Sequence, residues 1–408
     1  MAATTITSTP ITLTPINSSF RIPALDGLRG IAILLVVLFH AVFVLKFSHH
    51  FGLDWLMTLG RMGWSGVDLF FVLSGFLIGG ILLDARDSPS YFKVFYARRA
   101  FRILPVYFVV VTLAWLTVQA GNHGWLPEHL GSIFASRLPW WSYFTFTQNV
   151  WFTAVGTSGT VLSVTWSLAV EEQFYLVLPF LIRYIPRKYL LSVVVVLTIG
   201  APLLRMILMQ YYAHGAIACY VLMPCRADAL GLGVLSAMLV RMPEVYERLV
   251  RRRKLIYGMS FLLGGAVFLI AFTGYESFTS SLHGLEYSVL ALFYASVLLI
   301  AVTGEDLFVR VVLCNKPLMK LGMVAYGTYL FHGIFIQAFH YVPAQKSGIT
   351  FVLIIVGTRL LAAASSIALA GLFWHFFEKP LLRHGHVYKY SPPPSVAGSE
   401  GATSQGVA

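Results

Sequence analysis

Long apolar runs, separated by short polar segments, alternate along most of this chain. Ten of these runs are long enough to cross a bilayer, which takes about 20 predominantly apolar residues in a helix. They lie at roughly 28–47, 65–83, 103–120, 163–182, 190–210, 216–240, 255–273, 284–303, 318–340 and 350–377. Backbone that faces lipid must satisfy its hydrogen bonds within the segment, so each run is expected to be helical. The pattern predicts an all-α polytopic membrane protein, a bundle of about ten transmembrane helices.

The composition supports this class. Apolar residues make up 58% of the chain, charged residues only 11%, and the mean hydropathy is +0.76. A soluble globular domain carries about 25% charged residues, so this chain is far too apolar for one. The three cysteines are too few for a disulfide framework or a metal site, and no metal is expected.

The basic residues explain the net charge of +12. If residue 1 is cytoplasmic, the outside segments carry only Lys46, Arg61, Arg137, Arg205 and Lys346, and Arg226 and Arg359 lie within helices; all other Lys and Arg residues are inside. This asymmetry follows the positive-inside rule. We therefore expect both termini in the cytoplasm, a location in the plasma (inner) membrane of a bacterium, and membrane lipid rather than nucleic acid as a partner.

The two ends of the chain differ from the apolar part. Residues 1–21 are rich in Thr, Ser and Pro, and residues 386–408 end in SPPPSVAGSEGATSQGVA. Such compositions bury too little apolar surface to fold. We predict disordered cytoplasmic tails on either side of one transmembrane domain at 22–385.

Arg29 and His40 bracket the first apolar run, RGIAILLVVLFH. Eleven residues of α-helix rise roughly 16 Å and turn three times plus about 20°, so both side chains are expected on one face. Ionisable groups at such depth are costly and usually face a bundle interior where they serve function. A cation near the rim and a titratable base near mid-bilayer suit a long ligand with a charged end and a reactive end.

Other ionisable residues fall at a similar predicted depth. Counting about 1.5 Å per residue places them in one slab of the membrane: Asp68, Glu171, Arg226, Asp228 and His332. This predicts a polar reaction chamber. Purely structural roles stay open for these residues. A histidine can bond a backbone carbonyl, and Asp68 can be a structural partner of Arg226. Arg226 and Asp228 can also neutralise each other or other helices and only pack the bundle.

The segment YARRAFRILP places two more guanidiniums at the inner rim. Arg99 and Arg102 are three residues apart, hence on one helical face. Guanidiniums bind phosphates bidentately, although ordinary anchoring to anionic lipid is the alternative. With Arg29 close by, a cytosolic ligand that carries phosphate is expected.

Seven fragments in order resemble the acyltransferase-3 family of membrane acyltransferases. They are LDGLRGIAILLVVLFH, GVDLFFVLSGFLIGGIL, YARRAFRILP, TWSLAVEEQFYLVLP, RADALGLG, YGTYLFH and FEKPLLR. The resemblance covers about 22–385. It places the family's Arg and His on Arg29 and His40, and its RxxR motif on Arg99 and Arg102. The family's helix-2 aspartate falls on Asp68, and its glutamate falls on Glu171. Two further positions that the family marks fall on Arg226 and His332.

The resemblance implies transfer of an acyl group, usually acetyl, from cytosolic acyl-coenzyme A to a hydroxyl on a carbohydrate, a glycolipid or another hydroxylated acceptor. Many relatives carry an additional extracytoplasmic hydrolase-like domain, which this chain is expected to lack. A soluble extracytoplasmic partner or a homo-oligomer therefore stays open.

One mechanism joins these expectations. Arg29, Arg99 and Arg102 would hold the donor's phosphates, and His40 would act as general base on the acceptor. Asp68 or Glu171 would orient the imidazole, and Arg226 would stabilise the oxyanion; a covalent acyl-histidine stays open. Ser74 is discounted as a nucleophile because small residues commonly allow close helix packing, and Tyr175 is expected to pack. The alternatives are acylation of a small hydroxylated metabolite and a secondary transporter with midplane ionisable residues.

Overall fold

The structure is a computed structural model that describes residues 22–43, 54–156, 160–273, 283–304, 306–339 and 349–391. The predicted N-terminal tail and residues 392–408 lie outside these ranges. Every regular element within them is a helix, as the apolar pattern predicts.

Eight helical segments of the described chain are long and apolar enough to cross a membrane. They are α1 (Pro23–Leu38) with the π turn η1 (Phe39–Phe43); α2 (Asp54–Arg61) and η2 (Met62–Ser65) leading into α3 (Gly66–Asp84); α4 (Tyr91–Asn122); η3 (Val161–Thr165) with α8 (Trp166–Tyr184); α9 (Arg187–Tyr211); α13 (Arg253–Thr273); α14 (His283–Thr303); and α17 (Ile349–Phe373) with η6 (Trp374–Glu378) and α18 (Lys379–Gly385).

The two remaining predicted runs are broken. The run 216–240 consists of α10 (Gly215–Val221), then η4 (Met223–Arg226) and α11 (Ala227–Leu239), with a bend of 68°. Pro224 stands in the first turn after the break, where a proline can begin a helix but not continue one. The run 318–340 divides at Val324 into α15 (Lys316–Met323) and α16 (Ala325–Ala338).

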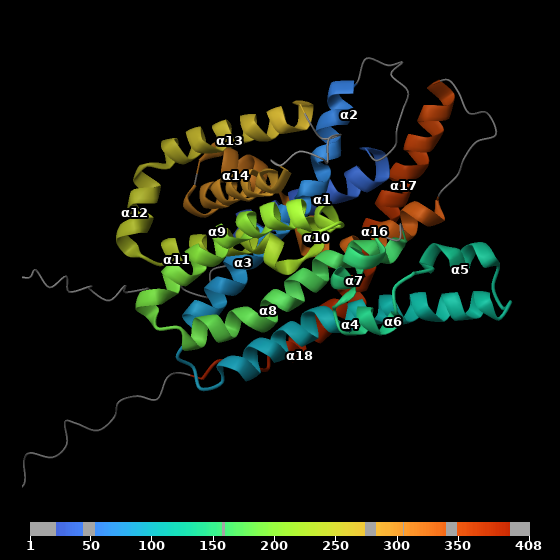
Figure 1. The fold of residues 1–408 in the computed structure, drawn as a ribbon, viewed down its shortest axis with the longest axis horizontal. Helices are drawn as coiled ribbons and strands as arrows, with labels where there is room; N and C mark the ends of the chain where they lie inside the picture. The colour runs from blue at the N-terminus through green and yellow to red at the C-terminus, as the bar shows by residue number, and fades with distance from the viewer. Residues whose placement is uncertain are drawn as a thin grey trace, which may run out of the picture.

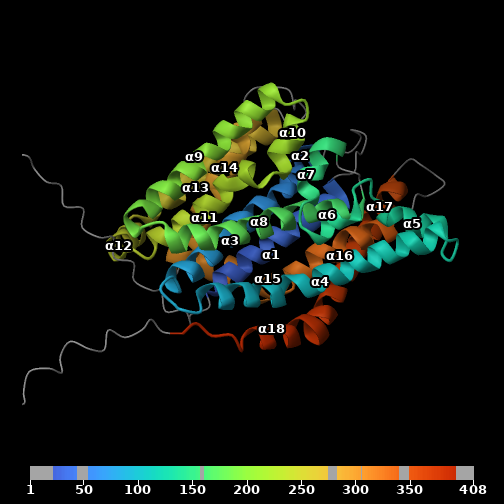
Figure 2. The same ribbon diagram turned by 60° about the horizontal axis from the view of Figure 1, so that its bottom comes forward.

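The short elements lie between the long helices. They are α5 (Glu128–Phe134), α6 (Trp140–Phe144), α7 (Gln148–Val155), α12 (Pro243–Arg251) and η5 (Val309–Leu313). In both views α12 lies at one end of the bundle and α5 at the other (Figures 1 and 2). The Asp84 carboxylate at the end of α3 accepts a hydrogen bond of 2.6 Å from Arg241, just before α12. The C-terminal end of α3 therefore marks the α12 end of the bundle.

Helix α3 runs through the centre of the molecule, and 83% of its apolar window is buried. Its closest neighbour is α11, at two glycines. A Cβ atom on Gly75 would overlap the carbonyl oxygen of Leu230, and one on Gly233 would overlap that of Val72. Small residues allow this backbone approach, so α3 is held against α11 on one side and leaves its other side for the site.

The described part of the predicted C-terminal tail lies against α4. The Arg98 Nε donates a hydrogen bond of 2.9 Å to the Tyr388 carbonyl, and Ser391 donates its backbone N–H to the Ser90 hydroxyl at 2.9 Å. Residues 386–391 thus pack beside the start of α4.

Candidate active site

A cavity of about 230 Å³ lies between α1, α3, α4, α8, the α15–α16 junction and the α17–α18 region. One face of α3 forms its longest wall: Val67, Phe70, Phe71, Ser74, Leu77, Ile78 and Ile81. From residue 67 to residue 81 an α-helix rises roughly 21 Å. The cavity is therefore long in the direction of the helices.

The three predicted donor-binding arginines line this cavity together. Arg29 comes from α1, and Arg99 and Arg102 come from α4, one turn apart. Arg29 lies 3.3 Å from Asp26 on its own helix. Within the described ranges, Arg99 and Arg102 have neither a hydrogen-bond partner nor an ion-pair partner. Two half-buried guanidiniums on one cavity wall, neither of them hydrogen-bonded to a carboxylate, can form a site for an anion.

A chain of three hydrogen-bonded side chains crosses the same cavity. The Tyr175 hydroxyl donates to Glu171 Oε2 at 3.1 Å, and it lies 2.5 Å from the Ser74 hydroxyl. All three residues line the cavity, two from α8 and one from α3. Glu171 thus takes Tyr175 as its partner, and the predicted contact of Glu171 with His40 is not formed in the described structure.

A second carboxylate, that of Glu378 in η6, also lines the cavity. The residue is only 6% exposed, and its Oε1 has no hydrogen-bond partner among the described residues. The FEKPLLR fragment contains this residue, but sequence reasoning gave it no role.

The two predicted catalytic histidines meet beside the cavity. The His40 and His332 rings lie 5.0 Å apart between centroids, which confirms that they reach the same depth. Each Nδ1 bonds a backbone carbonyl of its own helix, that of Val36 at 2.9 Å and that of Tyr329 at 2.7 Å. A carbonyl only accepts, so Nδ1 carries the proton, and the neutral ring presents its lone pair at Nε2.

The histidines differ in access. His332 is fully buried, and its Nε2 is unpartnered among the described residues. His40 is half-buried and belongs to the π turn η1. π turns are frequent at functional sites because they redirect side chains. Of the two, His40 is the more accessible base.

The histidine pair does not line the cavity itself. Tyr329, a lining residue, packs 5.7 Å from His332 and 6.4 Å from Phe70, which also lines the cavity. The Tyr329 hydroxyl lies 2.6 Å from the Ser167 hydroxyl. One aromatic layer therefore separates the arginine-lined cavity from the imidazoles.

Asp68 and Arg226 form a buried ion pair, and each is 1% exposed. Asp68 is thus the partner of Arg226 and not of His40. This pairing is the structural role for Asp68 that the sequence left open. The Arg226 guanidinium packs 4.2 Å from the Tyr287 ring and 5.7 Å from Phe71, which faces the cavity. The predicted oxyanion donor therefore lies behind Phe71, outside the cavity.

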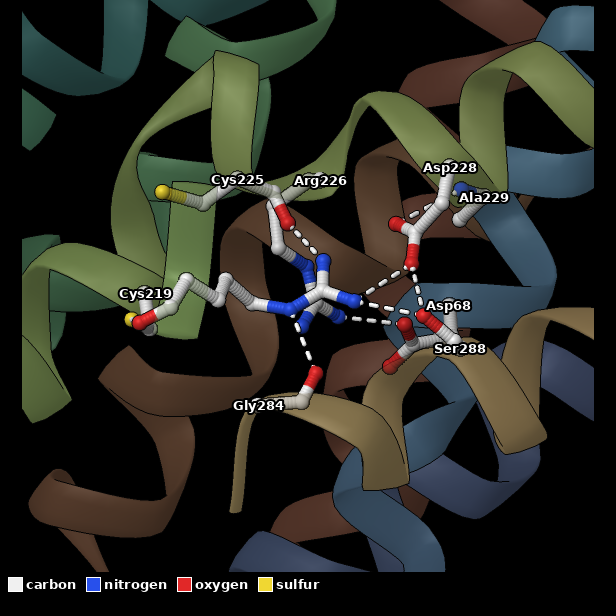
Figure 3. A network of polar contacts seen from close by, with 9 residues as sticks. Asp68, Cys219, Cys225, Arg226, Asp228, Ala229, Gly284 and Ser288 are labelled. Atoms are coloured by element: carbon white, nitrogen blue, oxygen red, sulfur yellow. Dashed lines mark hydrogen bonds and ion pairs between the residues drawn. The ribbon is translucent and has the colours of Figure 1, made fainter. Parts of the chain in front are cut away.

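A second buried ion pair adjoins the first. Asp228 and Arg205 approach within 2.6 Å, and Ser288 donates a hydrogen bond of 2.7 Å to the same Asp228 oxygen. Asp68, Arg226, Asp228 and Ser288 converge between α3, η4, α11 and α14 (Figure 3). Arg205, counted among the outside residues from the sequence, is completely buried in α9, where it pairs with Asp228.

Three site residues escaped or were discounted by the sequence reasoning. Ser74 and Tyr175 were taken as packing residues, and Glu378 was not considered. Helical spacing offered a signal for Tyr175. It follows Glu171 by one helical turn, so both side chains lie on the same face of α8.

Residues 22–375 match the family model described as an acyltransferase domain. The chain belongs to this acyltransferase family. It is a multi-pass protein of the bacterial plasma membrane, and six of the seven fragments that carried the resemblance fall within the matched region, while FEKPLLR begins just after it.

Curated members of this acyltransferase family match the chain over most of its length. YrhL of Bacillus subtilis (strain 168) is 31% identical over 384 residues, covering 89% of this chain and 55% of that protein. Peptidoglycan O-acetyltransferase OatA of Listeria monocytogenes is 27% identical, covering 90% and 56%. O-acetyltransferase OatA of Staphylococcus aureus (strain NCTC 8325) is 26% identical, covering 89% and 58%.

The chain thus spans a little more than half the length of these relatives. No solved structure matches it.

Proposed function

We propose that this chain is a membrane O-acyltransferase that moves an acyl group, acetyl in the first instance, from acyl-coenzyme A to a hydroxyl of a carbohydrate. Family membership supports the reaction class. The cavity supports the donor, and the names of two relatives, both O-acetyltransferases and one of them acting on peptidoglycan, support the acceptor class.

One observation carries the proposal: Arg99 and Arg102 line one cavity, and in the described structure neither has a carboxylate within ion-pair distance. Holding unneutralised charge away from water is costly. A ligand with several phosphate oxygens removes this cost and offers each guanidinium a bidentate contact. The nucleotide end of coenzyme A has this chemistry.

The rest of the donor follows the α3 wall. Apolar residues form most of this wall on both sides of Ser74. A flexible arm laid along it would carry the thioester from the arginines toward Phe70, Phe71 and Tyr329. Because basic residues concentrate in the segments around α12, we place the arginine end of the cavity toward the cytosol.

The histidine pair supplies the base in this scheme. His40 Nε2 would take the proton of the acceptor hydroxyl, while its Nδ1–H stays on the Val36 carbonyl and fixes the ring. His332 packs against that ring. Arg226 stays a candidate for charge stabilisation, and its pairing with Asp68 makes a positioning role for both the simpler expectation.

The test uses the full chain purified in detergent with acetyl-CoA and a saccharide acceptor, with free CoA and acetylated product measured by mass spectrometry. Loss of a hydrogen bond to a charged group costs about 1.5–3 kcal/mol. Arg99→Ala and Arg102→Ala should therefore raise the donor KM roughly 10- to 100-fold. Arg251→Ala, on exposed α12, is the matched control and should leave the KM unchanged.

Two results would contradict the proposal. One is a donor KM equal to the native value in the Arg99→Ala/Arg102→Ala double variant. The other is uptake of a solute into proteoliposomes with no release of CoA under any condition, which would favour a transporter.

A further inference from the structure

The hydroxyl of Ser74 lies midway along the α3 wall of the cavity and is hydrogen-bonded in a defined direction. Tyr175 has a single O–H, which it donates to the Glu171 carboxylate at 3.1 Å. With Glu171 ionised, the 2.5 Å contact between the Tyr175 and Ser74 oxygens is donated by Ser74. The order Ser74 to Tyr175 to Glu171 is that of a proton path which ends on a carboxylate.

Close helix packing does not account for Ser74. The approach of α3 to α11 is made at the next residue, Gly75, which meets the Leu230 backbone. Ser74 instead faces the cavity, with its neighbours on the same helical face, Phe71 and Leu77. The serine oxygen is thus open to a ligand, while the glycine beside it performs the packing role.

We propose that Ser74 takes the acyl group from the thioester before the acceptor does, so that the enzyme passes through an acyl-serine. Tyr175 and Glu171 carry the serine proton. This inference rests on the proposed function, because it requires a thioester donor in the arginine-lined cavity.

In the first half-reaction the Ser74 oxygen attacks the thioester carbonyl, and the C–O bond forms. The serine proton moves to the Tyr175 oxygen as the Tyr175 proton moves to Glu171. The C–S bond then breaks, the thiolate leaves with the electron pair, and it takes a proton from Glu171 through the same path. The products are the serine ester and free CoA thiol, with no change in oxidation state.

In the second half-reaction the acceptor hydroxyl attacks the ester carbonyl and loses its proton to the histidine base. The C–O bond to Ser74 breaks, and the serine oxygen regains a proton through Tyr175. The imidazolium loses its proton to solvent, and Tyr175 regains one proton from solvent, so that both groups return to their starting state. The acceptor ester is formed, and the enzyme is restored.

The arrangement of the cavity supports two half-reactions. The arginines line it together with Ser74, whereas the histidine pair lies beyond Tyr329 and Phe70. A covalent intermediate on Ser74 lets the donor's thiol depart before the acceptor occupies the outer part of the cavity. Donor and acceptor then need not fit in about 230 Å³ together.

The experiment incubates the purified full chain with acetyl-CoA and no acceptor, quenches in acid, and maps acetylated peptides by mass spectrometry. The peptide that contains Ser74 should carry one acetyl group. Ser74→Ala should lose both the adduct and the transfer activity, and Ser74→Cys should form a thioester that neutral hydroxylamine removes. Ser236→Ala, a buried serine of α11 that bonds the Leu232 carbonyl, should keep the adduct on Ser74.

Tyr175→Phe keeps the ring and removes the proton path, so it should slow adduct formation roughly 100-fold or more. Thermal unfolding of each variant in detergent separates this loss from misfolding. In native protein with acceptor, initial rates should show ping-pong kinetics, in which CoA leaves before the acceptor binds.

CoA release and acceptor acetylation at the native rate by Ser74→Ala would overturn the acyl-serine while leaving the proposed function intact. An acetyl group trapped on His40 instead of Ser74 would do the same. Absence of any acetyl-CoA turnover by the folded native chain would instead remove the proposed function on which the inference rests.

Discussion

His40 and His332 are each held in a single tautomer by the backbone of this bundle. Each ring donates Nδ1–H to a carbonyl of the preceding turn, which fixes the tautomer without any carboxylate. A histidine held in this way acts as a base only while Nε2 is unprotonated. The difference in burial is consistent with the proposal that His40 exchanges protons and that His332 supports its ring.

We expect His40→Gln to lower the rate of acceptor acetylation roughly 100- to 10,000-fold, because an amide cannot take the hydroxyl proton. In the native enzyme the rate at saturating donor should rise with pH as the imidazole loses its proton and then level off. The variant should lack this rise. Measured pH–rate profiles of acetylated product check this.

Donor binding provides the internal control for that variant. Acetyl-CoA affinity should stay near the native value, because the arginines that hold the donor lie on the other side of Tyr329. His384→Gln, on α18, should retain the native profile. An unchanged pH dependence in His40→Gln would show that another group removes the proton.

Sequence reasoning found the charged residues of the site more readily than their partners. Arg29, Arg99 and Arg102 line one cavity because helical spacing and a shared membrane depth are both readable from a chain. The partner of Asp68 was not readable, because depth along the membrane normal says nothing about direction around the bundle axis. The position of Ser74 on the cavity wall and the complete burial of Arg205 were unreadable for the same reason: nothing local distinguishes a side chain that faces a cavity from one that faces a neighbouring helix.

The helical elements were predictable to the extent that apolar length determines them. Nine of the ten predicted runs correspond to the eight long segments and the bent pair, and the tenth is divided into α15 and α16. Breaks arise where backbone bonding changes within an apolar run, so hydropathy does not detect them. Pro224 was the one local signal for the bend before α11.

The pairing of α3 with α11 gives a prediction for stability. Gly75→Ala places a Cβ against the Leu230 backbone, which cannot yield as a flexible side chain would. Overpacking of this kind costs typically about 1–3 kcal/mol. We expect Gly75→Ala to unfold in detergent at a lower temperature than the native chain. The fluorescence of the chain's tryptophans measures this unfolding.

Gly258→Ala in α13 is the matched control, since no atom lies within 4 Å of a Cβ there. Alanine favours a helix over glycine by about 1 kcal/mol, so this variant should equal or exceed the native stability. Equal unfolding temperatures for Gly75→Ala and the native chain would mean that α3 and α11 can separate without cost.

Across the whole molecule, the ionisable residues form three separate sites rather than one polar slab. The arginines and Glu171 line the cavity, the histidines pair beyond Tyr329, and the two ion pairs join α3 to η4 and α9 to α11. Counting residues along each helix placed these groups at similar depths in the membrane. In the bundle they lie in different directions around its axis. Among the described residues, the cavity arginines and His40 are more exposed than the side chains of the two ion pairs.

The paired charges predict a large effect from removing one member. Asp68→Asn leaves the Arg226 guanidinium buried and uncompensated, which costs about 3–5 kcal/mol. The double variant Asp68→Asn/Arg226→Gln should recover part of this loss. Glu244→Gln, which breaks the exposed pair with Arg248, should change stability by less than about 1 kcal/mol. Thermal unfolding of the native chain and these three variants in one detergent tests this prediction. A double variant less stable than Asp68→Asn would argue against a simple charge pair.

The orientation of the cavity in the membrane yields the last prediction. Arg251 on α12 and Trp125 before α5 are exposed, 77% for the arginine side chain and 78% for the tryptophan residue, and they mark the two ends of the bundle. Arg251→Cys and Trp125→Cys, in a background without the three native cysteines, can be distinguished by an impermeant maleimide in sealed proteoliposomes. Because the arginines proposed to hold the donor lie in the N-terminal halves of α1 and α4, toward the α12 end, acetyl-CoA should be consumed only from the side on which Arg251→Cys is labelled. Consumption from the Trp125→Cys side would reverse the proposed direction of transfer and place the anion site outside the cytosol.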